Sequence, residues 1–416
     1  MTERNGNTVA SAPQPARDVV RTGTAEAVLR PRRRPGHLGS LHVMQLLAVE
    51  AAIVAVLASL ASGIAVVIGA GVAAVLLLAL ALARHRGRWW LERRLIRRDH
   101  RRRRRNPGGT TGDRRLDALR VLAPGLSVED VKTPSGARVG VARDSAGWYA
   151  VAEVSRAPGD SPTEVPVDTL AEALMDVDQP GAVLQVVVQT VPAPSVDTHP
   201  SVPAGYSYRH LIANFGGEQI PADQTTWLTV RLDARSLAEA MGQDGSALDE
   251  APALTAALAR RVARSLTRHR LGHRLLDAEA LVHALARSCD LEPLAEITEP
   301  VRPREDWTQW HSARLTHRTF WVRTWPEVDQ VGTVLRAMTG VPAAMSTIAL
   351  TLMPEPRSGL LDLRGLVRIA APAAELGQVA HLVGTGARQA GADLFPVDGE
   401  QGPAVYASAP TGGGPR

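Results

Sequence analysis

A long uncharged stretch near the start of the chain restricts its possible folds more than any other feature. No charged side chain occurs among the 33 residues from Ala51 to Ala83, and arginine clusters lie on both sides of them. A single membrane span needs about 20 apolar residues. The apolar stretch 41–83 is about twice that length and has a Ser-Gly break near its middle. The pattern predicts a transmembrane hairpin of two helices, 41–61 and 64–83.

The arginine clusters also predict the orientation of the hairpin. Arginine in short flanking segments marks the cytoplasmic side of a span, and an even number of spans is needed when both flanks are basic. We therefore expect a multi-pass protein of the plasma membrane with both termini in the cytoplasm. A secretory signal peptide is the competing interpretation. It is disfavoured because a long polar segment precedes the apolar run and no cleavage-type ending follows it.

The positive charge of the chain is concentrated beside the membrane. Residues 84–105 carry a net charge of +10, whereas the residues that follow them carry −8. Anionic lipid headgroups are therefore a better partner for this segment than nucleic acid. The side chains expected at the membrane surface are Arg84, Arg86, Arg88, Trp89, Trp90, Arg93, Arg94, Arg97 and Arg98. The alternative is that these arginines act only as a topology signal.

Composition divides the chain into segments. We expect a disordered basic cytoplasmic tail at 1–40, the hairpin at 41–83, a basic juxtamembrane helix at 84–105, a linker at 106–115, a cytoplasmic domain at 116–408 and a disordered tail at 409–416. The periodicity predicts strands at 138–143, 148–155, 184–191, 226–232, 316–325, 347–353 and 360–370, and helices at 167–177, 235–241, 254–273, 278–288, 328–339 and 373–390. The domain is therefore expected to be α/β (mixed α+β), with one or two subdomains.

The first apolar helix carries features of a span that packs against other helices. Glu50 is an ionisable residue within the predicted span, and such residues normally face protein or water. The alternative is that the helix begins later and leaves Glu50 near the interface. Ala55, Ser59 and Gly63 follow at four-residue spacing, and small side chains let another helix approach closely. These four residues are the predicted helix-packing set.

Motifs for catalysis are weak in this sequence. Lys132 is the single lysine and lacks the glycines of a phosphate-binding loop, and Cys289 is the single cysteine. His269 and His273 have the spacing of two zinc ligands on one helical face, but Arg270 holds the position of the general base. We therefore expect no catalytic, cofactor-binding or metal-binding residues.

Two further sequence patterns resemble functional sites only in part. The glycines at 384 and 386 are similar to part of a dinucleotide fingerprint, but they fall inside a predicted helix. His311 and His317 have no partner that the sequence assigns, so we interpret them as polar residues of the core or surface. Trp307, Trp310, Trp321 and Trp325 lie within 19 residues, a density typical of core or interface anchors.

Taken together, this layout resembles a known family. Glu305-Asp306-Trp307 leads into Thr316-His-Arg-Thr-Phe-Trp-Val-Arg-Thr-Trp-Pro326, after a basic start, an apolar hairpin and a basic juxtamembrane segment. This arrangement resembles EccE, a membrane subunit of the type VII (ESX) secretion apparatus of actinobacteria. The resemblance implies a structural role beside the EccB, EccC and EccD subunits, with EccC as the ATPase.

Two classes of function remain. The first is a non-enzymatic scaffold of a secretion complex, which the hairpin, the helix-packing residues and the weak catalytic motifs favour. The alternative is a membrane-tethered cytoplasmic enzyme, such as a metal-dependent transferase, whose Asp176 and Asp178 would hold the metal. An Asp-x-Asp pair is common at helix ends, where acidic residues also form turns. We therefore favour the scaffold.

Overall fold

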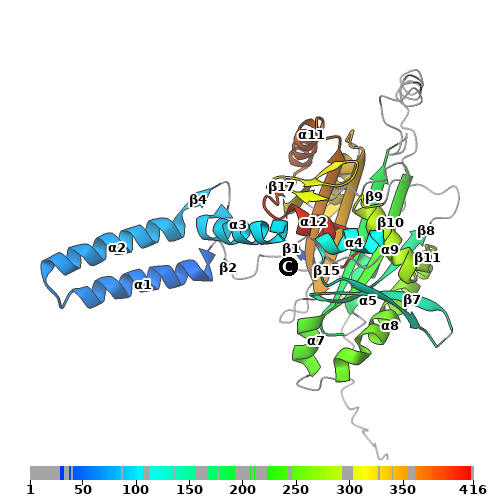
Figure 1. Ribbon diagram of the computed structural model, residues 1–416, viewed down its shortest axis with the longest axis horizontal. Helices are drawn as coiled ribbons and strands as arrows, with labels where there is room; N and C mark the ends of the chain where they lie inside the picture. The colour runs from blue at the N-terminus through cyan, green and yellow to red at the C-terminus, as the bar shows by residue number, and fades with distance from the viewer. Residues whose placement is uncertain are drawn as a thin grey trace, which may run out of the picture.

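The computed structural model has a projecting pair of helices, a connecting helix and a folded domain (Figure 1). The structure describes residues 29–31, 37–38, 41–85, 88–105, 113–134, 136–155, 167–175, 179–192, 207, 210, 223–241, 246–292, 303–326, 328–339, 341–354 and 361–413. Most of the predicted tail 1–40 and of the linker 106–115 lies outside these residues, as do Asp176 and Asp178. Within the tail, Leu29–Pro31 form strand β1 and His37–Leu38 form β2.

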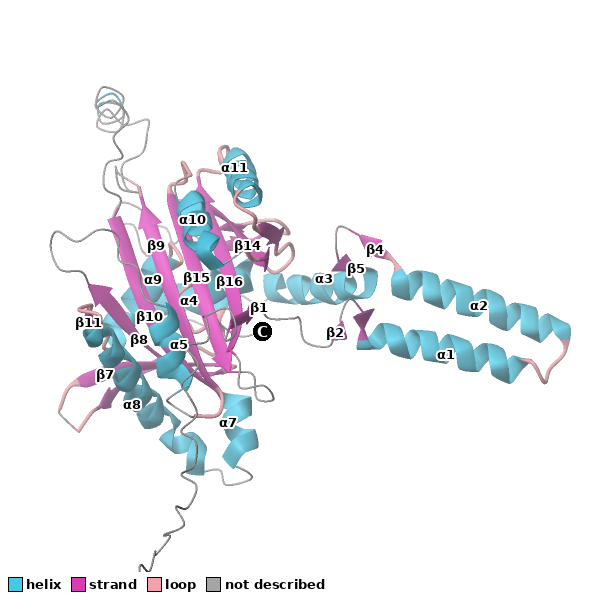
Figure 2. Cartoon of the chain, turned by 180° about the vertical axis from the view of Figure 1, so that it is seen from behind, coloured by secondary structure: helices cyan, strands magenta, loops and turns pink. Residues whose placement is uncertain are grey.

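The projecting pair consists of the two apolar segments of the sequence. Helices α1 (Val43–Ser59) and α2 (Ile64–Leu82) lie side by side in both views (Figures 1 and 2). Between them, the side-chain amide of Gln45 donates to the carbonyl oxygen of Ala81 at 3.0 Å. Among the described helices only α2 is long and apolar enough to cross a membrane, and α1 is shorter. The predicted pair of spans is therefore not confirmed.

The basic segment differs from the single helix predicted for 84–105. Strands β4 (Arg84–His85) and β5 (Arg88–Trp89) form a short antiparallel ladder, and α3 begins only at Trp90 and ends at Arg105. Ala83 leaves the helical conformation, with φ −58° and ψ 118°, and its carbonyl oxygen accepts from the amide of Trp90. The basic helix was predicted to begin at residue 84. That start was wrong because the local turn satisfies the backbone groups at the end of α2.

A single sheet runs through the folded domain in the order β12-β13-β14-β16-β15-β9-β10-β8-β7-β6. Its strands are β6 (Ser127–Lys132), β7 (Arg138–Asp144), β8 (Gly147–Ser155), β9 (Ala182–Val191), β10 (Asp223–Asp233), β12 (Arg304–Glu305), β13 (Trp310–His311), β14 (Thr316–Thr324), β15 (Met345–Pro354) and β16 (Leu361–Ala371). Strand β11 (Gly272–Leu275) pairs with β8, β17 (Asp393–Pro396) with β14, and β1 with β16. Among the described strands, only the pairing of β1 with β16 is parallel.

Helices cover both faces of the sheet. One face packs against α5 (Val167–Met175), α7 (Ala234–Met241) and α8 (Ser246–Arg268), and further along against α10 (Val328–Thr339) and α11 (Leu376–Gln389). These helices lie in front of the sheet in Figure 2. The opposite face packs against α4 (Arg114–Leu122), α9 (Ala278–Ser288) and α12 (Gln401–Ser408). The mixed α/β class is confirmed, with antiparallel pairing dominating the sheet.

Most predicted elements of the domain are present within a few residues. The strands predicted at 138–143 and 148–155 are confirmed as the antiparallel pair β7 and β8, with Asp144 opposite Gly147 at the turn. The helix predicted over 254–273 instead ends at Arg268. Arg270 adopts a φ of 57°, and the amide of Leu271 donates to the carbonyl oxygen of Leu266, which closes the helix end.

The C-terminus was predicted wrongly as a disordered tail at 409–416. Ala409 and Thr411 are fully buried within the part of this segment that the structure describes, 409–413. The amides of Thr411 and Gly412 donate to the side-chain oxygen of Gln185 at 3.2 and 2.8 Å. These hydrogen bonds hold the segment in place, because buried polar groups of the sheet and of the segment satisfy one another.

Candidate functional site

The clearest candidate site is the contact between α3 and the folded domain. The residues of α3 that face the domain recur at helical spacing, since Arg93, Ile96, Arg97, His100 and Arg103 lie three or four residues apart. Ile96 and His100 are buried, and Arg103 is half-buried. One face of this basic helix therefore packs on the domain, with Arg97 exposed at its edge.

An ion pair forms the centre of the contact. Arg103 donates from Nε and Nη2 to the two carboxylate oxygens of Glu305 at 3.0 and 3.1 Å, and from Nη2 to the carbonyl oxygen of Gly399 at 2.6 Å. Glu305 is buried and also accepts from the amide of Gly402, at the start of α12. A two-point bond between a guanidinium and a carboxylate fixes both orientation and distance. This geometry therefore holds α3 in one position on the domain.

Trp307 completes the contact. The guanidinium groups of Arg93 and Arg97 each lie 5.8 Å from the centre of its ring, within the range of a cation–π contact. His100 meets the same ring edge-on, with the ring centres 5.7 Å apart. Gly399 adopts a φ of +83°, and a Cβ there would lie 2.6 Å from both Ile96 and Trp307. Glycine at this position is therefore required by both backbone and packing.

The opposite face of α3 remains exposed. Arg94, Arg98, Arg101 and Arg102 are exposed, and the guanidinium of Arg94 lies 4.7 Å from the ring centre of Trp90. The predicted membrane-surface set is thus divided, with Arg93 and Arg97 toward Trp307 and Arg94 and Arg98 outward. The side chains of Arg84, Arg86 and Arg88 lie outside the described part, and Trp89 is half-buried.

The predicted helix-packing residues are also divided. Ser59 is buried and its hydroxyl donates to the carbonyl oxygen of Val56 at 2.7 Å, whereas Glu50, Ala55 and Gly63 are exposed. A Cβ at Gly63 would meet no atom within 4 Å. The packing role predicted for Glu50, Ala55 and Gly63 therefore stays a prediction.

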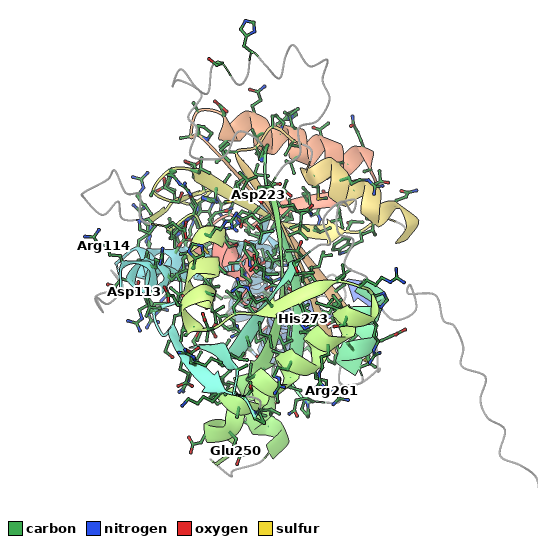
Figure 3. The ribbon with its side chains drawn as sticks, turned by 90° about the vertical axis from the view of Figure 1, so that its right-hand side faces the viewer. Asp113, Arg114, Asp223, Glu250, Arg261 and His273 are labelled. Atoms are coloured by element: carbon green, nitrogen blue, oxygen red, sulfur yellow. The ribbon has the colours of Figure 1, made fainter. Side chains whose placement is uncertain are left out.

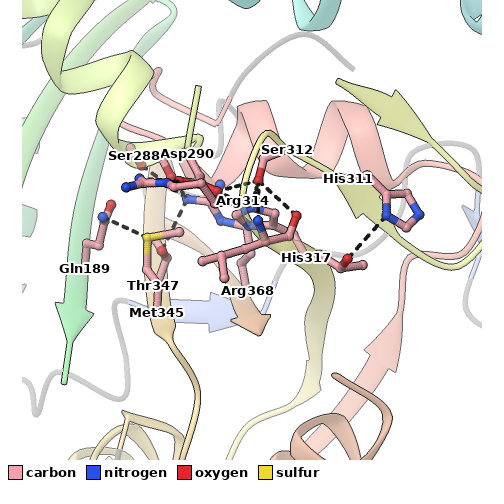
Figure 4. A network of polar contacts seen from close by, with 12 residues as sticks. Gln189, Ser288, Asp290, His311, Ser312, Arg314, His317, Met345, Thr347 and Arg368 are labelled. Carbon is pink, nitrogen blue, oxygen red and sulfur yellow. Dashed lines mark hydrogen bonds and ion pairs between the residues drawn. The ribbon is translucent and has the colours of Figure 1, made fainter. Parts of the chain in front are cut away.

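A buried polar network lies on the sheet face below α9 (Figure 4). Asp290 follows α9, and its carboxylate accepts from the hydroxyl of Ser312 and from Nε of Arg314, the latter at 2.7 Å. Nε2 of His317 lies 3.2 Å from the Ser312 hydroxyl and 3.8 Å from the Asp290 carboxylate. Arg368 donates from Nη2 to the carbonyl oxygen of Ser288 at 2.6 Å.

Burial governs the protonation of this network. It lowers the pKa of His317, which therefore stays neutral near pH 7. Burial opposes ionisation of Asp290, but its contacts with His317, Arg314 and Ser312 lower its pKa overall. Burial also raises the pKa of the Cys289 thiol to about 11, so this cysteine stays protonated. The network therefore carries fixed charges rather than a readily titrated group.

Ser312, His317 and Asp290 do not have the geometry of a hydrolase triad. The serine hydroxyl donates directly to the carboxylate, and both partners of His317 meet the same ring nitrogen. All three side chains are also buried. The sequence did not predict this cluster, because Asp290, the segment 312–317 and Arg368 are far apart along the chain. In the sequence each is only a polar residue beside apolar ones.

His311 and the predicted zinc pair, His269 and His273, lie in separate parts of the fold. His311 lies opposite Thr316 in the β13–β14 ladder, and its Nε2 donates to the carboxylate of Asp306 at 2.9 Å. His269 lies past the end of α8 and His273 lies in β11, so the two do not share a helical face, contrary to expectation. Within the described residues there is no group of three or more His, Cys, Asp or Glu side chains that could hold a metal ion.

Comparison with known proteins identifies one segment. Residues 220–322 match the family model described as "Putative type VII ESX secretion system translocon, EccE". The matched segment runs from the start of β10 into β14 and includes Glu305 and Trp307, which hold α3. No match is found among curated proteins. The match covers about a quarter of the chain and confirms the resemblance to the EccE family.

Proposed function

From this EccE resemblance we propose that the chain is a non-enzymatic structural subunit of a type VII secretion membrane complex. The family match supports the general part of this statement, a component of a type VII secretion translocon. The observation that carries the scaffold role is the docking of α3, because the helix that follows the apolar pair is bonded to the domain through Arg103 and Glu305. A rigid connection of this kind transmits the position of membrane helices to a domain outside the bilayer.

The partners proposed for this scaffold are EccB-, EccC- and EccD-type subunits. Glu50, Ala55 and Gly63 are exposed on the apolar pair, which supports contact with helices of other subunits. Gly63→Leu adds a bulky side chain where no atom of the described residues lies within 4 Å of the added Cβ, so it should leave the isolated protein intact and reduce its assembly. Gly69→Leu is the matched control, because a Cβ at Gly69 also meets nothing within 4 Å.

Assembly is measured by extraction in mild detergent, native sizing and detection of the ATPase subunit in the same peak. We expect wild type and Gly69→Leu to migrate with the ATPase subunit and Gly63→Leu to be depleted from it. A wild-type chain that runs as a lone monomer would contradict the proposal. Turnover of a nucleotide-sugar by the purified domain with Mg²⁺ or Mn²⁺ would replace it with the enzyme alternative.

The proposed topology places both termini in the cytoplasm, with α1 and α2 each crossing the plasma membrane. Single cysteines at positions 20 and 300, in a Cys289→Ser background, should both be protected from an impermeant reagent in intact cells. Labelling at one position alone would indicate an odd number of spans.

The proposed lipid contact is the outer face of α3. A fragment of residues 84–416 should bind anionic vesicles at low salt and dissociate at high salt, because the attraction is between exposed charges. Replacing Arg94 and Arg98 by Gln should weaken binding more than replacing Arg93 and Arg97, which lie over Trp307. Binding that ignores salt would point to apolar insertion instead.

A further inference from the structure

The exposed face of α8 is acidic at one end and basic at the other. Glu250 is exposed near the start of the helix, whereas Arg261, Arg264 and Arg268 are exposed in its last two turns. Figure 3 shows Glu250 and Arg261 at separate positions along α8. Like charges three or four residues apart on a helix repel one another. A partner that supplies negative charge beside Arg264 and Arg268 would relieve the repulsion between these two arginines.

The two charged ends are aligned and separated by small residues. Glu250, Ala257 and Arg264 are spaced by seven residues, which is close to two helical turns and places them along one line of the helix. Ala253 and Ala257 are exposed between the charged ends. Alanine side chains allow a second helix to approach to about 8 Å between axes.

This face is available to a neighbour beside the protein. Helix α8 lies in front of the sheet in Figure 2, so its face opposite the sheet points sideways relative to α1 and α2. Glu250, Ala257 and Arg264 are exposed along the outside of α8, whereas its inner face packs on β8 and β10. A second molecule with its apolar helices in the same membrane can therefore present its own α8 to this surface.

We propose that α8 packs antiparallel against α8 of a second copy of this chain, with the two-fold axis at Ala257. Glu250 of each copy then lies opposite Arg264 of the other, because both residues are seven positions, or about 10 Å, from the axis. The same surface serves both copies, as a two-fold interface requires. A parallel pairing would bring the arginines of the two copies together, so charge complementarity selects the antiparallel one. This inference goes beyond the proposed function, and anchoring in one membrane raises the effective concentration of the two copies.

Crosslinking through a single cysteine tests the axis. In the full-length Cys289→Ser chain in membrane vesicles, Ala257→Cys should form a dimer with a short bismaleimide, since the two cysteines meet at the axis. Thr267→Cys is the matched control on the same helix. It is ten residues from the axis, so the two copies of it should lie about 30 Å apart and fail to crosslink.

Charge reversal tests the pairing. Adding Glu250→Arg to Ala257→Cys should lower the crosslinked fraction by about tenfold, because each contact loses two attractive pairs and gains two repulsive ones. Adding Arg264→Glu as well should restore it. The experiment is done in cells that lack the other secretion subunits, so its outcome is independent of the assembly assay.

Two results would overturn the proposal. The first is equal crosslinking, or none, at positions 257 and 267. The second is a loss with Arg264→Glu that Glu250→Arg does not restore, which would assign the basic end of α8 to an acidic surface of a different protein. Thermal unfolding of each variant checks that the exposed substitutions leave the fold intact.

Discussion

Two arginines lie fully buried on the same face of the sheet, and their surroundings differ. Arg231 on β10 is 3% exposed and Arg368 on β16 is 1% exposed. Arg231 forms an ion pair with Asp144, with one bond at 3.1 Å, and donates to the carbonyl oxygen of Thr411 at 2.7 Å. Arg368 donates from Nη2 to Ser288 and Thr347, while its Nε and Nη1 form no hydrogen bond with the described residues.

The two arginines differ in how far nearby negative groups compensate their positive charge. Burial would lower the pKa of Arg231, but the hydrogen bond and charge of Asp144 raise it above its ordinary value. Burial lowers the pKa of Arg368, which has only weaker compensation. Arg368 binds the last residue of α9, where the helix end carries only a partial negative charge.

The comparison shows that the turns and helices covering a sheet decide how well the charge of a buried arginine is compensated. Asp144 sits at the β7–β8 turn, and Tyr406 of α12 donates to it at 3.0 Å. The hydroxyl of Tyr149 joins the same group at 2.9 Å from that of Tyr406. Arg231 therefore belongs to a connected polar network, and removing one member should leave the others unsatisfied.

The largest effect is expected for Asp144→Ala. This change leaves the charge of Arg231 buried without its partner, so the free energy of unfolding should fall by about 3–5 kcal/mol. Chemical denaturation of the detergent-solubilised chain measures it. The double variant Asp144→Leu with Arg231→Met should recover much of the loss, since it removes both charges. A small loss for Asp144→Ala would show that water reaches Arg231.

Removing the C-terminal segment should have the next largest effect. Deletion of residues 409–416 takes away the carbonyl acceptor of Arg231 and the two amides that donate to Gln185. The free energy of unfolding should fall by about 2–4 kcal/mol, because each buried group left unpaired costs about 1 kcal/mol or more. Deletion of 414–416 is the control and should change little. Equal stability of both deletions would mean that the segment is dispensable.

Arg368→Met should cost less than Arg231→Met. Among the described residues, methionine removes a guanidinium whose Nε and Nη1 form no hydrogen bond, and it breaks no ion pair with a carboxylate. We expect a loss of about 1 kcal/mol or less, against about 3–5 kcal/mol for Arg231→Met. Denaturation of the two variants side by side makes the comparison. A loss as large as that of Arg231→Met would show that Arg368 has a compensating partner.

The smallest effect at neutral pH is expected for His317→Gln, whose signature is in the pH dependence. The folded-state pKa of His317 lies below its ordinary value of 6.5, so below that pH the unfolded state binds a proton that the folded state does not. Stability therefore falls as the pH drops from 6.5, and His317→Gln should reduce this slope. Asp290, whose pKa is also lowered, keeps its contribution until the pH falls through its folded-state value. An unchanged slope between pH 7 and 5 would contradict this assignment.

Much of the domain was predictable because its signals are local. The alternation around Asp144 and Gly147 is that of a two-residue hairpin, and α9 and α10 were predicted with their observed bounds, 278–288 and 328–339. Strand β17 and helix α12 were missed because both are short and carry little periodicity of their own. Their packing against β14 and β16, which is not local, holds them in place.

The candidate site was only partly predictable. The arginines of α3 and the Glu305-Asp306-Trp307 motif stood out separately, but nothing in the sequence linked them. Arg103 and Glu305 are separated by about 200 residues along the chain and meet only because β12, α12 and α3 converge. From the sequence, Arg93 and Arg94 were both expected at the membrane surface. In the structure the guanidinium of Arg93 lies over Trp307, whereas Arg94 is exposed and lies beside Trp90.

The sequence by itself determined the properties that depend on neighbouring residues: the apolar stretch, the position of the basic charge, the periodicity of most helices and strands, and the family resemblance. Tertiary structure alone decided which arginines are paired and whether the C-terminus is ordered. Helical and strand periodicity follows from backbone geometry over a few residues. The partner of a buried charge depends instead on which distant segments the fold brings within hydrogen-bonding distance, and that distance is set only when the whole sheet and its covering helices are assembled.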